Sequence, residues 1–80
     1  MYYVYILQSK AKPDEFYKGF TEDLKLRLAE HNRGNCDHTS KYKPWKIIYY
    51  CAFANKKKAL DFEKYLKSAS GIAFMRKRLL

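Results

Sequence analysis

The stretch YYVYILQSKAKPDEFYKGF, residues 2–20, is the most informative part of this chain about its fold. Its first part, YYVYILQ at 2–8, is rich in aromatic and β-branched side chains, which favour β-strands. The polar segment 9–15 contains Pro13, which is typical of a turn. The segment FYKGF at 16–20 alternates in the way a second strand does. The stretch therefore predicts a β-hairpin.

The residues that follow the hairpin predict a helix. Thr21 offers a hydroxyl group as N-cap, and Glu22 and Asp23 come next, in a first turn where the helix dipole favours acids. This helix is expected to run to about Asn32, with Gly34 as its stop, because glycine readily adopts the left-handed conformation of a C-cap.

The second half of the chain predicts one more strand and two helices. WKIIYYCAFA, residues 45–54, is apolar on both faces, as expected of a strand covered on both sides. Asn55 caps a predicted helix at 56–68, and Ser70 caps another at 71–79. The order β-β-α-β-α-α is an α+β arrangement, and we expect all 80 residues to form one domain.

Charge is distributed unevenly along the chain. The net charge is +9, and residues 1–40 carry six Lys/Arg against six Asp/Glu. Residues 41–80 carry eleven against two, so the whole excess lies there. A strongly basic half predicts a polyanionic partner, and nucleic acid is the natural one. The alternative is an ordinary solvated basic surface.

The two cysteines, Cys36 and Cys51, are too few and too isolated for a disulfide scaffold. A zinc site that combined them with His31 and His38 is disfavoured, because the chain has no CxxC or HxxxH motif. The first residues have neither a basic leader nor a long apolar run, and no window reaches the length of a membrane span. We therefore expect a soluble, cytoplasmic protein that does not associate with membranes.

Glu63 occupies an unusual position in the segment ALDFEKYL. Ala59, Phe62 and Leu66 have the spacing that lines one face of a helix, and Glu63 falls within the same stripe. An isolated buried carboxylate is costly, so an inward glutamate must be paired, protonated or bound to a metal. A structural ion pair with Arg27 or Lys64 is the alternative to a functional role.

The first predicted helix repeats this pattern. Leu24, Leu28 and His31 share a stripe, so His31 faces inward, and Arg27 lies one turn earlier near its edge. An inward histidine is also common as a hydrogen-bonded core residue, and an arginine can extend along an apolar surface to reach water. Neither residue identifies a site alone.

Strand alternation adds tyrosines to this set. Tyr3 and Tyr5 face one side of their strand, and Tyr17 and Gly19 share one side of theirs. Together with an acid, an arginine and a histidine, such groups suit phosphodiester hydrolysis. That reaction needs a base, a cation for the developing negative charge and a carboxylate-held divalent ion. Tyrosine is a poor base near its ordinary pKa of about 10, and nearby cations would have to lower that pKa.

The order of these residues resembles the GIY-YIG nuclease superfamily in its minimal, single-domain form. The resemblance covers nearly the whole chain and rests on Tyr3-Val4-Tyr5, Tyr17-Lys18-Gly19, Thr21, Arg27, His31-Asn32, Gly34, Thr39, Pro44-Trp45 and Glu63. It implies a small three-stranded sheet flanked by three helices, and metal-dependent cleavage of DNA. The chain departs from the motifs at two positions, with Tyr3 in place of a glycine and Lys18 in place of an isoleucine.

The resemblance also implies a role for each matching residue. Glu63 would hold one divalent ion, Mg²⁺ or Mn²⁺, and Arg27 would contact the scissile phosphate. Tyr5 and Tyr17 would activate or position the water, and His31 would assist by hydrogen bonding. Which tyrosine is the base stays open. Supporting roles fall to Gly19, Thr21 and Asn32.

Binding of the nucleic acid would rest on lysines and arginines of the basic half. The candidates are Lys41, Lys43, Lys46, Lys56, Lys57, Lys58, Arg76, Lys77 and Arg78. Phosphate contacts of this kind give salt-sensitive binding without reading of bases. The predicted function is a structure-directed or weakly specific DNA endonuclease, with RNA as a possible substrate. The alternatives are a nucleic-acid-binding module of the same fold without nuclease activity, and a protein-interaction domain.

Overall fold

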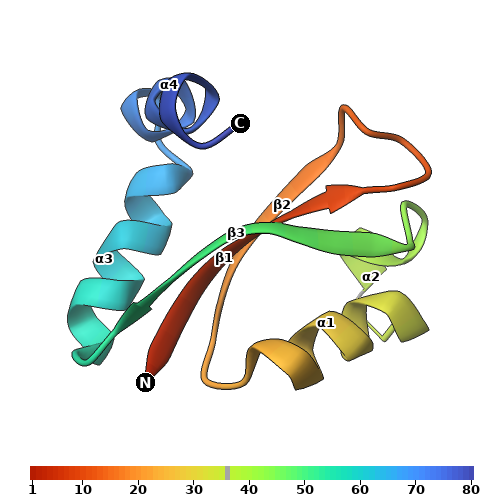
Figure 1. Ribbon diagram of the computed structural model, residues 1–80, viewed down its shortest axis with the longest axis horizontal. Helices are drawn as coiled ribbons and strands as arrows, with labels where there is room; N and C mark the ends of the chain where they lie inside the picture. Colours follow the sequence, from red (N-terminus) through yellow and green to blue (C-terminus); the bar gives the residue numbers. More distant parts are fainter. Residues whose placement is uncertain (36) are drawn as a thin grey trace.

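Three antiparallel strands form the centre of the computed structural model, which describes residues 1–35 and 37–80. They are β1 (Tyr2–Ser9), β2 (Phe16–Thr21) and β3 (Trp45–Phe53). The strand order is β2-β1-β3, so β1 is central and the predicted hairpin is confirmed (Figure 1). The α+β fold class is confirmed as well.

Four helices surround the sheet: α1 (Leu24–Arg33), α2 (Asp37–Ser40), α3 (Lys56–Leu66) and α4 (Ala69–Arg78). The helical turn α2 lies within the loop expected between the first helix and the third strand, and it is an addition to the predicted order. The longest helix of the described residues, α3, has 11 residues, and none is long and apolar enough to cross a membrane.

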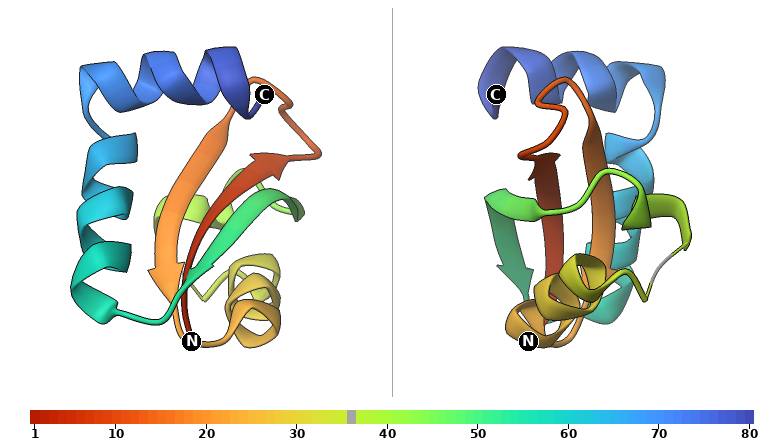
Figure 2. Two further views of the ribbon diagram at one scale, coloured as in Figure 1. Left: turned by 60° about the vertical axis from the view of Figure 1, so that its left-hand side comes forward. Right: turned by 90° about the vertical axis from the view of Figure 1, so that its right-hand side faces the viewer.

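The helices cover opposite faces of the sheet. Figures 1 and 2 show α1 on one side, and α3 with α4 on the other, where α4 lies crosswise at the end of α3. Alternation along β1 explains the two layers, because successive side chains point to opposite faces. On the α1 face, a buried cluster contains Tyr5, Leu7 and Trp45, with Leu24 and Leu28 packed against it. On the other face, the buried cluster comprises Val4, Ile6, Ala59, Leu66 and Met75.

The third strand is not covered as predicted. β3 is an edge strand, and Tyr50 in its middle is 55% exposed. The strand buried on both faces is β1, in which Val4, Ile6 and Leu7 are all inaccessible to water. The strand is covered unevenly: Ile48, Tyr49, Cys51 and Phe53 pack against the cluster on the α3 face, whereas on the α1 face the packing comes from Trp45 and Ile47 at the start of the strand.

The start of the first helix also differs from the prediction. The N-cap is Asp23, whose side chain accepts a hydrogen bond from the backbone N–H of Leu26 at 3.0 Å. Thr21 still belongs to β2, and its hydroxyl oxygen accepts from the N–H of Asp23, at 3.1 Å. Thr21 therefore shapes the turn before the helix, and Glu22 precedes the first turn. The stop at Gly34 is confirmed, with φ at 81°.

The boundaries of the last two helices shift slightly. Asn55 caps α3 as predicted, and its side chain accepts from the N–H of Lys58. The helix ends at Leu66, two residues early, and α4 begins at Ala69 with Ser68 as its N-cap instead of Ser70. Ser68 takes this role because its hydroxyl oxygen accepts from the N–H of Gly71, at 3.1 Å.

A close approach between strands makes Gly19 a test of this packing. Gly19 lies opposite Tyr5, and a Cβ added there would come within 2.5 Å of Cζ of that ring and nearer still to its hydroxyl. We expect Gly19→Ala to lower the free energy of unfolding by about 1–3 kcal/mol, as overpacking does. Urea denaturation measures the change. In a Tyr5→Leu background the added penalty of Ala should largely vanish, and an equal penalty in both backgrounds would contradict the contact.

Candidate active site

A buried chain of hydrogen bonds joins three elements on the α1 face. The hydroxyl of Tyr5 in β1 lies 3.1 Å from Nε2 of His31 in α1. Nδ1 of His31 lies 2.8 Å from the hydroxyl oxygen of Thr39 in α2. All three side chains are at most 1% exposed. The inward orientation predicted for His31 is confirmed, and the histidine satisfies both ring nitrogens with hydroxyl groups that can donate or accept.

The environment of His31 favours the neutral imidazole. Burial lowers the pKa of His31, and the positive charge of Arg27 lowers it further, while Glu30 acts weakly in the opposite direction. A neutral ring donates from one nitrogen and accepts at the other, which matches one hydroxyl partner on each side. The network thus joins β1, α1 and α2 through hydrogen bonds that suit a neutral imidazole.

Tyr17 lies next to this network. Its ring centroid is 4.9 Å from that of His31 and 6.3 Å from that of Tyr5. Tyr17 comes from the edge strand β2 and is half-buried, whereas Tyr5 is 1% exposed. Of the two predicted catalytic tyrosines, Tyr17 is therefore the one within reach of solvent.

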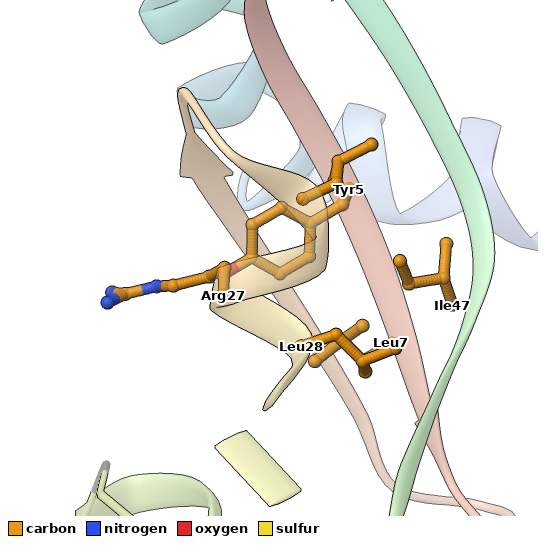
Figure 3. Close-up of a pocket in the computed structure, with 6 residues that line it drawn as sticks. Tyr5, Leu7, Arg27, Leu28 and Ile47 are labelled. Carbon is orange, nitrogen blue, oxygen red and sulfur yellow. The ribbon is translucent and has the colours of Figure 1, made fainter. Parts of the chain in front are cut away.

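Arg27 lies in α1 near Tyr5 and His31. Its aliphatic stem lines a small pocket with Tyr5, Leu7, Leu24, Leu28 and Ile47, and Figure 3 shows its guanidinium directed away from those groups. The guanidinium forms an ion pair with Glu30 at 3.4 Å, in which both side chains are about a third exposed. The stem is thus held by apolar packing, while the charged end lies at the surface.

Glu63 is placed differently from these groups. It belongs to α3, which covers the opposite face of the sheet from α1 (Figure 1). Its Oε2 accepts from Nζ of Lys67 at 3.2 Å, and its side chain is 21% exposed. The structure thus brings Tyr5, Tyr17 and His31 together with Arg27 nearby, and it puts Glu63 on the helix that covers the other face of the sheet.

The donor set limits what metal the chain could hold. Within residues 1–35 and 37–80, no group of three or more His, Cys, Asp or Glu side chains is clustered. The zinc alternative involved Cys36, which lies outside the described residues, and His31, which already contacts Tyr5 and Thr39. A single carboxylate such as Glu63 fits an ion that keeps most of its waters, as Mg²⁺ does.

The predicted supporting residues hold the elements in place. The side-chain amide of Asn32 donates to the carbonyl of Trp45 at 3.1 Å, and its oxygen accepts from the N–H of Trp45, at 2.5 Å. The indole of Trp45 in turn donates to the carbonyl of Thr39 at 2.9 Å. Gly19 provides the space that the ring of Tyr5 fills. Asn32 therefore ties α1 to the start of β3, and Trp45 fixes the segment that carries Thr39.

The predicted phosphate-binding cations are all exposed but lie on several elements. Lys57 forms an ion pair with Asp61 at 3.2 Å, and Lys41 lies over the ring of Tyr42. The full set comprises Lys41, Lys43, Lys46, Lys56, Lys57, Lys58, Arg76, Lys77 and Arg78. Sequence reasoning did not include Thr39, Lys18 or Lys67 among the site residues. Of these three residues, only Lys18 stood out in the sequence, because a lysine is unusual in an alternating strand segment.

Comparison with known proteins assigns the chain to a family. The family model described as the GIY-YIG catalytic domain matches residues 1–76. The chain belongs to the GIY-YIG family, which is of the nuclease type. Within it, the chain is similar to proteins named UPF0213. One from Lacticaseibacillus paracasei is 40% identical over 67 residues, which span 82% of this chain and 73% of that protein.

Two further relatives carry the same name. A UPF0213 protein from Clostridium perfringens is 40% identical over 68 residues, spanning 84% of this chain and 71% of its own length. Another from Streptococcus pyogenes is 38% identical over 66 residues, spanning 81% and 70%. The similarity therefore extends over most of each protein.

The depressed pKa of His31 predicts how stability changes with pH. Below the ordinary histidine pKa of about 6.5, His31 binds a proton in the unfolded chain but not in the folded protein, where its pKa is lower. The contribution of the buried, neutral His31 to the free energy of unfolding is therefore complete above pH 6.5 and is lost as the pH falls below 6.5. Urea denaturation between pH 7.5 and 5 should show a steeper loss for the wild type than for His31→Gln. The exposed His38 provides the control, since His38→Gln should keep the wild-type slope.

Proposed function

We propose that this chain is a metal-dependent endonuclease that hydrolyses phosphodiester bonds in DNA, in a structure-directed or weakly specific manner. The observation that carries the proposal is the half-buried Tyr17 packed at 4.9 Å on His31, with Arg27 extending to the surface from the same helix as His31. Family membership supports the same reaction class. The net charge of +9 suits a phosphate backbone.

The two tyrosines receive different roles in this proposal. Tyr17 takes the proton of the attacking water or orients that water, because it is the accessible one. Tyr5 is 1% exposed and hydrogen-bonded to His31, so it acts as a positioning residue. A tyrosine needs nearby positive charge to become a base at neutral pH. Arg27 and a divalent ion would supply that charge.

Arg27 and Glu63 complete the set. The guanidinium of Arg27 suits a scissile phosphate because its planar donors match two phosphate oxygens. Glu63 would hold Mg²⁺ or Mn²⁺, which when bound stabilises negative charge on phosphate oxygens. Since α1 and α3 cover opposite faces, the substrate backbone would cross the edge strand β2, between Tyr17 on one face and Glu63 on the other.

A second candidate function also has support. The carboxylate of Glu63 is already paired with Lys67, at 3.2 Å, and its helix lies across the sheet from the tyrosines. A binding module of the same fold, which contacts DNA or RNA through its basic surface without cutting it, would tolerate this arrangement. The nuclease would require Glu63 for cleavage, whereas the binding module would not require Glu63 for binding.

Substitution of Glu63 separates these functions. Glu63→Gln keeps the size of the side chain but removes the charge, so we expect Mg²⁺-dependent nicking of plasmid DNA to fall by about 100-fold or more. DNA binding and the urea midpoint should stay close to those of the wild type. Asp61→Asn on the same helix is the matched control and should cut normally. Equal cutting by Glu63→Gln would refute the catalytic role, and a wild type that binds but never cuts would favour the binding module.

The two tyrosines can be separated in the same assay. Tyr17→Phe should lower the cleavage rate by about 10²–10⁴-fold with little effect on stability, since a half-buried hydroxyl at the surface is removed. Tyr5→Phe should instead cost about 1–3 kcal/mol of stability, because His31 loses a buried hydrogen-bond partner. Single-turnover cleavage rates and urea curves measure the two effects. The reverse pattern would assign the proton transfer to Tyr5.

A further inference from the structure

Three cations from different elements gather on the face of the sheet opposite the tyrosines. Lys18 belongs to β2, Lys67 follows α3, and Arg76 belongs to α4. Nζ of Lys18 donates to the carbonyl of Leu66 at 3.2 Å, at the end of α3. Nζ of Lys67 contacts Glu63 at 3.2 Å, one helical turn away. We call Lys18, Lys67 and Arg76 the β2–α4 cluster.

The electrostatics of the β2–α4 cluster are unfavourable when nothing is bound. Burial lowers the pKa of the Lys18 ammonium, and the positive charges of Lys67 and Arg76 lower it further. An apolar side chain at this strand position would pack against α3 without any of that cost. The chain nevertheless carries a lysine where GIY-YIG motifs have an isoleucine.

A purely structural role accounts for only part of the cluster. Lys18 satisfies one of the last carbonyl groups of α3, which a helix C-terminus requires. That bond uses one of the three N–H donors of an ammonium group. Capping of Leu66 puts Lys18 next to Lys67, the following residue, but it does not explain why Arg76 of α4 adds a third positive charge close enough to act on Lys18. A bound anion would remove the repulsion and use the remaining donors.

We propose that the β2–α4 cluster binds a phosphate of the nucleic-acid backbone, next to the one that is cut. Ammonium and guanidinium groups form charge-assisted hydrogen bonds with phosphate oxygens, and here the charges of Lys67 and Arg76 act on Lys18 from two other elements. Lys67 is in contact with Glu63, so a phosphate held here lies beside the carboxylate that would carry the metal. This inference rests on the proposed nuclease function.

The path of the substrate follows from strand alternation. Tyr17 and Lys18 are consecutive residues of β2, and their side chains point to opposite faces of the sheet. Because β2 is an edge strand, a nucleic-acid strand that crosses it meets Tyr17 on one face and Lys18 on the other. The cluster thus extends the site around the edge of the sheet and orients the strand.

Binding of fluorescent DNA without divalent metal tests the cluster separately from cleavage. Lys18→Met, Lys67→Met and Arg76→Met should each weaken binding by about 3–10-fold and reduce the slope of log K against log salt by about 1. Lys10→Met, an exposed lysine in the turn between β1 and β2, removes the same charge and should change binding less than about twofold. Because Arg76 is exposed on α4, Arg76→Met should not disturb the fold. It therefore still tests the cluster if Lys18→Met disturbs the end of α3.

The possible outcomes separate this inference from the nuclease proposal. If the three cluster variants match Lys10→Met, the β2–α4 cluster is not a phosphate site, whatever the result for Glu63. If the cluster variants weaken binding but Glu63→Gln still cuts, the β2–α4 cluster is supported as a phosphate site, and the catalytic assignment of Glu63 fails. Titration with inorganic phosphate, followed by NMR of the wild type and Lys18→Met, distinguishes a site for a nucleic-acid phosphate from a site for free phosphate. Binding of free phosphate without any DNA binding would overturn the assignment to a nucleic-acid strand.

Discussion

Burial of His31 between two hydroxyl groups is the constraint on which the α1 side of this protein depends. A fully buried imidazole must satisfy both ring nitrogens, and here Tyr5 and Thr39 do so at 3.1 and 2.8 Å. The bonds fix α1 against the central strand and hold the segment before β3. Trp45 reinforces that segment through its indole bond to the carbonyl of Thr39. The precise placement of Tyr17 and Arg27 follows from this support.

The edge strand β2 distributes the chemistry between two faces. Tyr17 reaches the His31 network on one face, and Lys18 reaches the end of α3 on the other. Because every strand residue alternates in direction, one short strand can contribute to both sides without any loop insertion. The site proposed above therefore continues around the sheet edge, where a long polyanion would lie. The ion pair of Lys67 with Glu63 links the cationic cluster to the proposed metal ligand.

Some expectations failed for reasons that involve contacts distant in sequence. Thr21 is a good capping residue, but pairing with Tyr3 keeps it in β2, and Asp23 caps the helix instead. Residues 45–54 are apolar enough for a covered strand, yet strand order puts β3 at the edge and β1 at the centre. From the sequence, Lys18 could be interpreted as a substitution without functional effect, at a strand position that accepts different side chains. Its neighbours Leu66, Lys67 and Arg76 are all far away in the sequence.

The α+β order, the hairpin, the glycine stop at Gly34 and the inward face of His31 could be predicted from the sequence, because each depends on local periodicity or backbone preference. Membership of the GIY-YIG family could also be predicted from the order of short motifs. The burial of Tyr5, the exposure of Tyr17 and the position of Glu63 across the sheet could not be predicted in this way. Strand order and helix packing set these distances, and both arise from contacts between residues far apart in the chain.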